Sequence, residues 1–249
     1  MTEYKLPPLL EKAYLDKKIK DINGEQCDFH SGINREEAER LIQVIKENKA
    51  VKTLEIGLAM GASAVCFCET ASGIKKDSLH YAIDPYQFAD WKGTGVRLID
   101  DSGLKDNFKL LEGKTHEVFH YFLDNGIKLD MAFIDGWHTF DYTFIDFFFV
   151  DQVLKDGGIL AFHDMYAFSK QKVLRFIKTH RDYEILYNYR ITEKDRWKTF
   201  KFFVWRILKK PLLIFSWYHW KFQFFSPYGI IFLKKKSSFE PNFDFYKKF

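Results

Sequence analysis

The chain has few cysteines, and their spacing suits neither a disulfide framework nor a metal clamp. Three cysteines occur among 249 residues, an odd number. Cys66 and Cys68 stand two positions apart on a predicted helix, so their side chains face different directions. The start of the chain is charged and lacks the apolar core of a secretory signal. These absences predict a reduced, cytoplasmic protein.

Other absences narrow the class of protein further. The sequence contains no internal repeat and no low-complexity segment, which excludes repeat architectures. Its most apolar stretch is interrupted by Arg206, Lys209, Lys210 and Pro211, so we expect no transmembrane helix there. The dinucleotide fingerprint G-x-G-x-x-G is missing, which disfavours a nicotinamide cofactor. What remains fits one large α/β domain with additions.

Charge is distributed unevenly along the chain. The net charge is +4. Residues 191–249 contain 13 Lys and Arg against 4 Asp and Glu, so this part carries +9 and the preceding part carries −5. The sequence therefore predicts a mildly acidic body and a basic, aromatic tail that need separate explanations.

Predicted strands and helices alternate along the body. Helical patterns cover residues 8–20, 34–48, 62–72, 96–103, 116–125, 141–154 and 170–180. Strand-like runs cover residues 51–56, 79–83, 108–111, 129–134, 159–162, 183–189 and 229–233. This alternation is typical of a doubly wound, Rossmann-like parallel sheet with helices on both faces. Ligands then bind beyond the carboxyl ends of the strands.

A glycine turn directly follows the first predicted strand of the body. In TLEIGLAMGAS, residues 53–63, Gly57 and Gly61 have no Cβ, so the backbone can turn sharply and approach a ligand. The next strand ends on Asp84, whose carboxylate can accept hydrogen bonds from both ribose hydroxyls. This combination predicts a nucleotide-binding βαβ unit and favours S-adenosylmethionine over a dinucleotide.

Acidic and imidazole side chains follow two later strands. Asp135 and Asp164 end adjacent parallel strands, where two carboxylates suit Mg²⁺. His163 is either a third ligand or a brace for the loop, and His138 lies within reach of a metal-bound hydroxyl whose proton it can take. Taken singly, each residue fits helix capping or core hydrogen bonding as well. Their placement together at one edge, beside a cofactor loop, favours chemistry.

The segment 133–165, FIDGWHTFDYTFIDFFFVDQVLKDGGILAFHDM, resembles catechol O-methyltransferase-like enzymes. It is more similar still to bacterial class I S-adenosylmethionine-dependent methyltransferases that often modify sugars and other natural products. The resemblance covers about residues 32–164, with AIDPY as the ribose motif and KLLEGKT along the adenine. It implies a seven-stranded sheet whose last strand is antiparallel. The cofactor residues that it implies are Glu55, Gly57, Gly61, Ser63, Asp84, Glu112, Gly113, Thr115 and Asp135.

The same resemblance assigns roles beyond the cofactor. The acid after the fourth strand is a metal ligand in catechol-type enzymes and corresponds to Asp135. Their catalytic lysine corresponds to His138, and the Asp-Asn pair after their fifth strand corresponds to His163-Asp164. A histidine base titrates nearer neutrality than a lysine. The resemblance thus implies Asp135 and His138 as catalytic residues and Asp135, Asp164 and His163 as ligands of a divalent metal such as Mg²⁺.

The insertion at residues 191–227 is dense in aromatic and basic residues. Aromatic anchors mixed with cations suit an interfacial helix on an anionic membrane. A substrate lid, a dimer interface and a nucleic-acid surface are alternatives. We expect no nucleic-acid partner, because the body is acidic and lacks a recognised nucleic-acid motif. Lys234, Lys235 and Lys236 are expected to be solvated surface.

We predict four parts in the chain. Residues 1–31 form an N-terminal helical lid or oligomerisation segment, 32–190 the methyltransferase core, 191–227 the aromatic-basic insertion, and 228–249 the final strand and tail. The function that we expect is O-methylation of a sugar or another small hydroxylated metabolite, including a lipid-linked one, by a homo-oligomer at the inner face of the membrane. The rivals are a non-catalytic module that keeps the nucleotide fold and a hydroxylase-like oxidoreductase.

Overall fold

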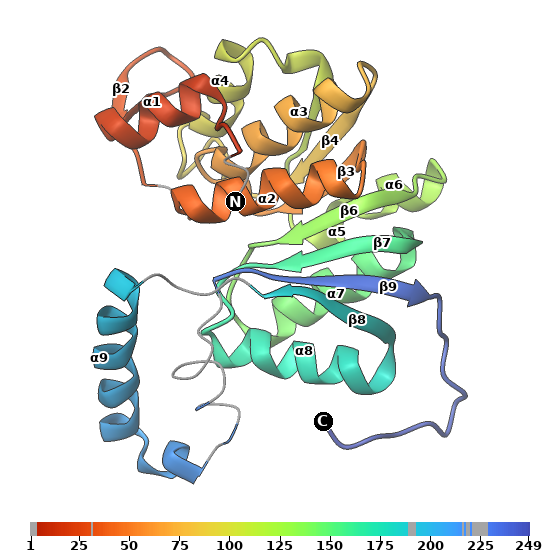
Figure 1. Ribbon diagram of the computed structural model, residues 1–249. Helices are drawn as coiled ribbons and strands as arrows, with labels where there is room; N and C mark the ends of the chain where they lie inside the picture. Colours follow the sequence, from red (N-terminus) through yellow and green to blue (C-terminus); the bar gives the residue numbers. More distant parts are fainter. Residues whose placement is uncertain (1–3, 31, 189–192, 216, 218–219, 221–228) are drawn as a thin grey trace.

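A seven-stranded sheet forms the centre of the computed structural model, which describes residues 4–30, 32–188, 193–215, 217, 220 and 229–249 (Figure 1). The strand order is β5-β4-β3-β6-β7-β9-β8. Its strands are β3 (Lys52–Ile56), β4 (Leu79–Ile83), β5 (Phe108–Leu111), β6 (Leu129–Ile134), β7 (Leu154–Phe162), β8 (Asp182–Asn188) and β9 (Ile231–Ser237). β9 runs antiparallel to β7 and β8, and the other neighbours are parallel. The predicted Rossmann-like sheet with an antiparallel last strand is confirmed.

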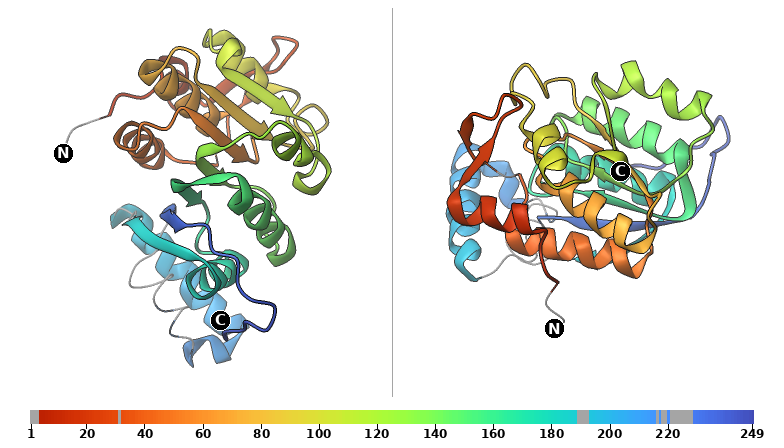
Figure 2. Two further views of the ribbon diagram at one scale, coloured as in Figure 1. Left: turned by 90° about the vertical axis from the view of Figure 1, so that its right-hand side faces the viewer. Right: turned by 90° about the horizontal axis from the view of Figure 1, so that it is seen from above.

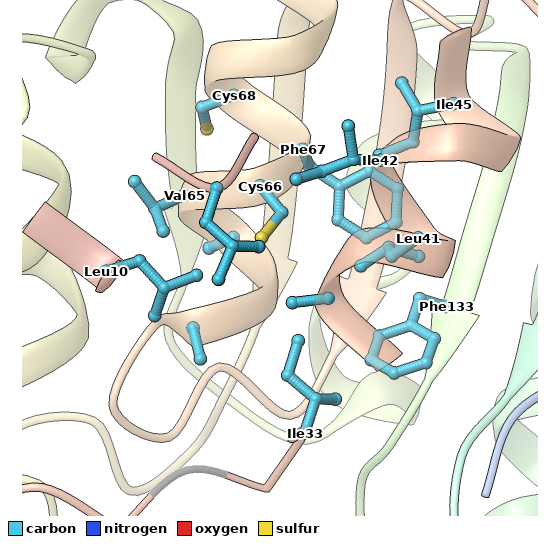
Figure 3. Close-up of a cluster of buried hydrophobic side chains, with 14 of the residues drawn as sticks. Leu10, Ile33, Leu41, Ile42, Ile45, Val65, Cys66, Phe67, Cys68 and Phe133 are labelled. Atoms are coloured by element: carbon cyan, nitrogen blue, oxygen red, sulfur yellow. The ribbon is translucent and has the colours of Figure 1, made fainter. Parts of the chain in front are cut away.

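Helices cover both faces of the sheet (Figures 1 and 2). One face carries α2 (Arg35–Glu47), α3 (Ala62–Ile74) and α4 (Thr94–Asp101), and the other carries α5 (Thr115–Val118), α6 (His120–Asp124), α7 (Phe140–Val153) and α8 (Phe168–His180). Side chains of β6 alternate between the two cores: Phe133 packs with α2 and α3, whereas Ile134 packs with α7 and α8. Figure 3 shows Phe133 beside Leu41 and Phe67 in the first core.

A capping box begins the second helix and places an acid near the sheet edge. Asn34 Oδ1 accepts a hydrogen bond from the Glu37 backbone N–H at 3.0 Å, and Glu37 Oε2 accepts one from the Asn34 N–H at 2.8 Å. This reciprocal capping box satisfies two backbone donors at the start of α2. Glu37 is buried, and its carboxylate also faces His163 in the candidate site described below.

The N-terminal segment differs from the purely helical prediction. α1 (Pro8–Asp16) ends where Lys17 adopts φ 51°. A hairpin of β1 (Lys18–Lys20) and β2 (Gln26–Asp28) follows. Leu6 and Leu10 are fully buried in the same core as α2 and α3, so the segment packs against the methyltransferase core.

Three further element boundaries were predicted wrongly. The predicted helix 116–125 is broken into α5 and α6. β7 starts at Leu154, before the glycine pair that was expected to precede it. β9 begins at Ile231 and extends through the lysines expected to be solvated surface. Lys235 is buried, and its Nζ donates to the backbone oxygens of Asp151 and Leu154 at 2.5 and 3.2 Å, which satisfies the ammonium group inside the sheet.

The insertion contributes α9 (Glu193–Lys209) and a short 3-10 helix, η2 (Pro211–Phe215). Other predicted residues of the insertion, 191–192, 216, 218–219 and 221–227, lie outside the described residues. In the part of the chain that the structure describes, no helix combines the length and apolarity needed to cross a membrane.

Candidate active site

A cavity of about 470 Å³ lies at the carboxyl ends of β3, β4 and β6. This is the edge where the sequence predicts ligand binding, and the volume lies in the ordinary range for small-molecule sites. Its lining combines apolar, aromatic and acidic side chains with glycine backbone: Ile56, Gly57, Ala59, Ile83, Asp84, Pro85, Tyr86, Asp90, Trp91, Gly113, Lys114, Thr115, Asp135, Gly136, Trp137, His138, Tyr142 and Asp146.

The glycine turn fits between neighbouring backbone segments. Gly57 has φ 95°, and a Cβ there would lie 2.5 Å from the backbone oxygen of Asp135. Gly61 has φ 79° and precedes α3, where a Cβ would lie 2.9 Å from the Cα of Gly95. Any larger residue would force these segments apart and would be strained by its positive φ. The expected sharp turn at both glycines is present, and the close approach that it allows in the structure is to neighbouring backbone segments.

Asp84 holds the glycine turn in place. Its Oδ2 accepts hydrogen bonds from the Leu58 and Ala59 N–H groups at 3.0 and 2.9 Å, and its Oδ1 accepts one from the Tyr86 N–H at 2.8 Å. A carboxylate has about four acceptor positions, so Asp84 retains room for a further donor from a ligand. The predicted ribose acid is thus also the residue that shapes the loop.

The structure divides the predicted cofactor residues into two groups. Gly57, Asp84, Gly113, Thr115 and Asp135 line the cavity, whereas Glu55, Gly61, Ser63 and Glu112 do not. Glu55 is fully buried in β3, where it accepts a hydrogen bond from Ser63 Oγ at 2.5 Å and lies 3.4 Å from His80 Nε2. Burial raises the pKa of Glu55 against the effect of these partners. Glu55 and Ser63 therefore brace the strand and helix beneath the turn.

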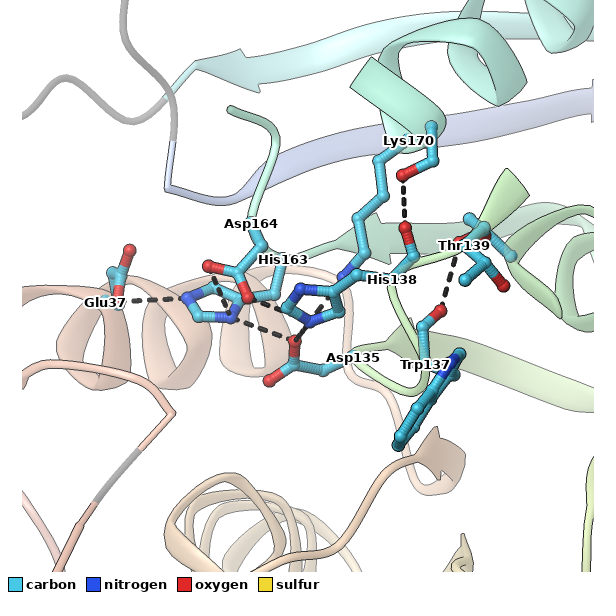
Figure 4. Close-up of polar contacts among 10 residues, drawn as sticks. Glu37, Asp135, Trp137, His138, Thr139, His163, Asp164 and Lys170 are labelled. Carbon is cyan, nitrogen blue, oxygen red and sulfur yellow. Dashed lines mark hydrogen bonds and ion pairs between the residues drawn. The ribbon is translucent and has the colours of Figure 1, made fainter. Parts of the chain in front are cut away.

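Three predicted catalytic or metal residues meet beyond β6 and β7 (Figure 4). Asp135, His138 and Asp164 each offer a ligand atom, and these atoms lie within 4.8 Å of one another. His138 Nε2 is 3.1 Å from an Asp164 oxygen and 4.0 Å from Asp135 Oδ1. Ser169 Oγ donates to the backbone oxygen of His138, which fixes the loop that carries the imidazole. His138 remains 45% exposed and can be reached by a ligand.

His163 lies behind this cluster. Its Nδ1 is 3.0 Å from Asp135 Oδ1, and its Nε2 is 3.3 Å from Glu37 Oε2. Burial alone would lower the pKa of His163, but the Asp135 and Glu37 carboxylates hold it well above its usual value. With both ring nitrogens facing carboxylates, His163 does not join the set of mutually close ligand atoms. The bracing role therefore fits the structure better than direct metal ligation.

Lys170 adds a buried positive charge beside Asp135. It was not among the predicted site residues. It lies in α8 with a fully buried side chain, and its Nζ is 3.5 Å from Asp135 Oδ1. The ammonium group makes no hydrogen bond to the described residues. Burial alone would raise the pKa of Asp164, but the His138 hydrogen bond and the charges of His163 and Lys170 hold it well below its usual range.

Aromatic walls and one acid also escaped prediction. Tyr86, Trp91, Trp137 and Tyr142 line the cavity, with the Tyr86 and Trp137 ring centroids 6.4 Å apart. Asp146, in α7, accepts a hydrogen bond from Thr115 Oγ1 at 2.6 Å, and burial raises its pKa to about 6. For Tyr86, Trp91 and Trp137 the signal available in the sequence was their position in the segments that follow strand ends, whereas Tyr142 lies within α7.

The fold, the glycine turn and the cavity are those expected from the resemblance to class I S-adenosylmethionine-dependent methyltransferases. Residues 54–165 match the model of a family described as a methyltransferase domain. This match confirms the resemblance found in the sequence: residues 54–165 are similar to a methyltransferase domain. Among curated proteins, none matches the chain significantly.

Solved structures share the fold at low sequence identity. The O-methyltransferase TomG from Streptomyces achromogenes, involved in tomaymycin synthesis and solved with S-adenosylmethionine, is 12% identical with a TM-score of 0.58. The alignment covers 82% of each chain. An O-methyltransferase from Bacillus cereus in complex with S-adenosylhomocysteine is 12% identical with a TM-score of 0.54, covering 62% of this chain and 74% of that one. These similarities show that the chain shares the fold of these proteins.

Proposed function

We propose that this protein transfers the methyl group of S-adenosylmethionine to a hydroxyl oxygen of a sugar or another small hydroxylated metabolite, free or lipid-linked, with help from a divalent metal. The observation that carries this proposal is the convergence of Asp135, His138 and Asp164 within 4.8 Å beside the cofactor cavity. A hydroxyl acceptor needs such a group, because its proton must leave as the oxygen attacks the methyl carbon.

The donor set fits a divalent cation. Two carboxylates that end neighbouring strands supply the oxygen ligands that Mg²⁺ prefers, and an imidazole lies beside them. Asp135 and Asp164 would hold the ion, with His163 fixing Asp135 from behind at 3.0 Å. A bound divalent ion would polarise the acceptor hydroxyl and lower its pKa. The buried Lys170 ammonium already offsets part of the negative charge there.

The protein's own groups account for the remaining work. Donor and acceptor are brought together by the cavity walls, and alignment of the nucleophile with the methyl group and sulfur supplies much of the rate. His138 is the proposed base: it is partly exposed, and its Nε2 sits 3.1 Å from Asp164, whose negative charge favours the imidazolium formed when it takes the proton. The reaction yields the methyl ether, S-adenosylhomocysteine and one proton.

A second hollow supports a polar acceptor. It measures about 570 Å³ and is lined by the N-terminal segment and the start of α2, including Lys17, Asp28 and His30. Gly32, in its wall, lies against the site: a Cβ there would be 3.2 Å from Asp135 Oδ2. Hydrogen-bonding side chains in a hollow whose wall reaches Asp135 suit a molecule with several hydroxyls.

The test is methyl transfer by the purified full chain. S-adenosylhomocysteine formation and acceptor mass are measured with catechol, monosaccharides and nucleotide-linked sugars, with Mg²⁺ and with chelator. We expect a mass gain of one methyl group on a hydroxylated acceptor, lost in chelator and in Asp135→Ala. Asp124→Ala, an exposed carboxylate on α6, is the matched control and should behave like the wild type.

Two outcomes would contradict parts of the proposal. Full activity of Asp135→Ala in chelator would show that Asp135 has only a structural role and that the reaction does not need a metal. Binding of the methyl donor with no product on any hydroxylated acceptor, while a nitrogen or carbon acceptor is methylated, would reject the oxygen acceptor.

A further inference from the structure

The outer surface of the insertion exposes a large apolar area. Leu208 in α9 and Leu212 and Phe215 in η2 are 75%, 81% and 85% exposed. Trp197 and Trp217 are 67% exposed. An area of this kind on a soluble protein marks an interaction site more often than a neutral surface.

Several apolar residues of α9 lie on a face that is exposed to solvent. Trp197, Val204 and Leu208 are spaced seven and four residues apart, which places them on one helix face, and all three are exposed. Phe203, on another face, is 3% exposed. The helix therefore presents apolar residues to solvent as well as to the protein, whereas the usual amphipathic helix confines them to the face that packs on the core.

The inner face of α9 anchors this surface next to the candidate site. Arg206 Nη1 donates to the backbone oxygen of Tyr166 at 2.9 Å, and its guanidinium lies 4.6 Å from the centroid of the Phe168 ring. Tyr166 is two residues beyond Asp164. In Figure 1, α9 stands on the side to which the carboxyl ends of β6 and β7 point. Whatever binds the outer face of α9 is thus close to the loop that carries Asp164.

Beyond the first turn of α9, which contains Glu193 and Asp195, the charges beside the apolar area have one sign. Lys201, Lys209 and Lys210 are exposed, and Lys209 Nζ lies 4.1 Å from the Trp205 ring centroid. From residue 196 to residue 239 the sequence contains no Asp or Glu. A protein partner or a second copy would need acidic groups placed to match these cations. A lipid bilayer with anionic headgroups presents both complements at once, apolar chains for the rings and negative charge for the ammonium groups.

We propose that the outer face of α9 and η2, formed by Trp197, Val204, Leu208, Leu212, Phe215, Lys201, Lys209 and Lys210, is a docking surface for an anionic membrane. The protein binds peripherally, with the rings and leucines at the acyl boundary and the ammonium groups among the headgroups. Binding holds the carboxyl edge of the sheet toward the lipid. The inference stands on exposure and charge alone and does not depend on the proposed reaction.

The experiment is flotation of the full chain with vesicles of phosphatidylcholine, with and without phosphatidylglycerol, at low and high salt. We expect flotation only with the anionic vesicles and weaker flotation at high salt. Each lysine near an anionic surface contributes about 1 kcal/mol, so Lys209→Glu with Lys210→Glu should weaken binding by at least about 30-fold. The matched control is Lys76→Glu with Lys105→Glu, two exposed lysines near the opposite edge of the sheet, which should bind like the wild type.

A second pair of variants tests the apolar contribution. Leu208→Ser should reduce flotation severalfold, whereas Leu123→Ser, at an exposed leucine of α6, should leave it unchanged. Circular dichroism and the melting temperature of each variant establish that it is folded. Three results would overturn the proposal: no flotation in any condition, equal flotation with neutral and anionic vesicles, or a wild-type dimer that Leu208→Ser converts to monomer without any vesicle binding. The last result would make the same face an interface between copies.

Discussion

The carboxyl ends of β3 and β4 are held by backbone hydrogen bonds, whereas those of β6 and β7 carry a cluster of charged side chains. On the first side, Asp84 accepts three backbone N–H groups and the glycine turn leaves no room for a Cβ. On the second side, Asp135 lies between His163 and Lys170, and Asp164 lies against His138. The first side is a fixed arrangement of backbone groups, and the second side is a cluster of titratable side chains.

This difference matches the two tasks of a methyltransferase. The methyl donor is the same for every acceptor, so a fixed backbone arrangement can bind it. Proton removal from an acceptor needs groups whose charge can change, and these gather in the second half. The comparison implies that changes in the first half should affect cofactor binding and changes in the second half should affect turnover. The predictions below test that separation, in order of decreasing effect.

The largest effect is expected at Asp84. Asp84→Ala removes the proposed ribose acceptor and the three backbone contacts of the loop. A charge-assisted hydrogen bond contributes about 1.5–3 kcal/mol, so loss of the ribose contact together with loss of the loop's three anchoring bonds should weaken S-adenosylhomocysteine binding about 10³-fold. The measurement is the rise in melting temperature that S-adenosylhomocysteine causes by mass action. Asp106→Ala, at an exposed acid of the 3-10 helix η1 (Lys105–Asn107), is the control.

Asp84→Asn keeps the side chain's shape and one acceptor oxygen, so it should give an intermediate loss rather than a collapsed loop. If NAD stabilised the wild type and S-adenosylhomocysteine did not, the assignment of this half of the edge to the methyl donor would be wrong.

A smaller effect is expected at His138, in the second half. His138→Ala should lower kcat about 10²-fold with little change in KM, because a general base acts in the transition state. The rise in melting temperature with S-adenosylhomocysteine should stay at the wild-type value. His116→Ala, at a partly exposed histidine of α5, serves as the control. An unchanged kcat would remove His138 as the base.

The sheet was predictable because its strands are short, continuous apolar runs between turns. β4, β5 and β6 have the bounds that their apolar residues predict. β9 was misplaced because Lys234, Lys235 and Lys236 look like solvated surface, although backbone oxygens satisfy the Lys235 ammonium inside the fold. The β1–β2 hairpin has six residues in its strands, among which only Ile19 is buried. An apolar pattern with a single buried residue is too short for the strands to be predicted from the sequence.

The site was predictable where it depends on strand order and unpredictable where it depends on helix packing. Asp135 and Asp164 follow neighbouring strands, and their approach follows from the parallel sheet. Glu37 and Lys170 come from α2 and α8, and a lysine or glutamate on a helix is ordinarily solvated. Their burial beside Asp135 depends on how the two helices lie across the sheet edge, which local sequence does not specify.

Lys170 should influence metal binding at the carboxyl ends of β6 and β7. The Lys170 ammonium and a divalent ion would both face Asp135, so their positive charges repel. Unit charges about 4 Å apart near a protein surface interact by about 4 kcal/mol, and hydration of the ion screens part of this. Lys170→Met should therefore bind Mg²⁺ or Mn²⁺ more tightly, about 30-fold, as measured by isothermal titration calorimetry.

The opposite result has a specific meaning. If Lys170→Met were inactive and bound no metal more tightly than the wild type, the ammonium itself would be the cation that Asp135 requires. Lys172→Met, a neighbouring exposed lysine of α8, controls for the loss of charge on that helix.

The smallest effect is expected at Asp146, which joins the two halves. Thr115, beyond β5, donates to Asp146 on α7 at 2.6 Å. Burial raises the pKa of Asp146 from 3.8 to about 6 in the folded protein. A folded pKa above the unfolded value means that the folded state holds the proton more tightly. The resulting stabilisation is complete below the unfolded pKa and disappears as pH rises through about 6.

Asp146→Asn isolates this contribution, because the amide cannot titrate. With folded and unfolded values about two units apart, the wild type should lose about 1.4 kcal/mol of unfolding free energy between pH 5 and pH 8 relative to the variant. Urea denaturation at both pH values measures the difference. Asp141→Asn, at the exposed start of the same helix, where the Thr139 hydrogen bond lowers the pKa of Asp141, should not reproduce this change. A wild type whose stability relative to Asp146→Asn is the same at both pH values would show that Asp146 is ionised throughout, and the link between the halves would then be a permanent charge.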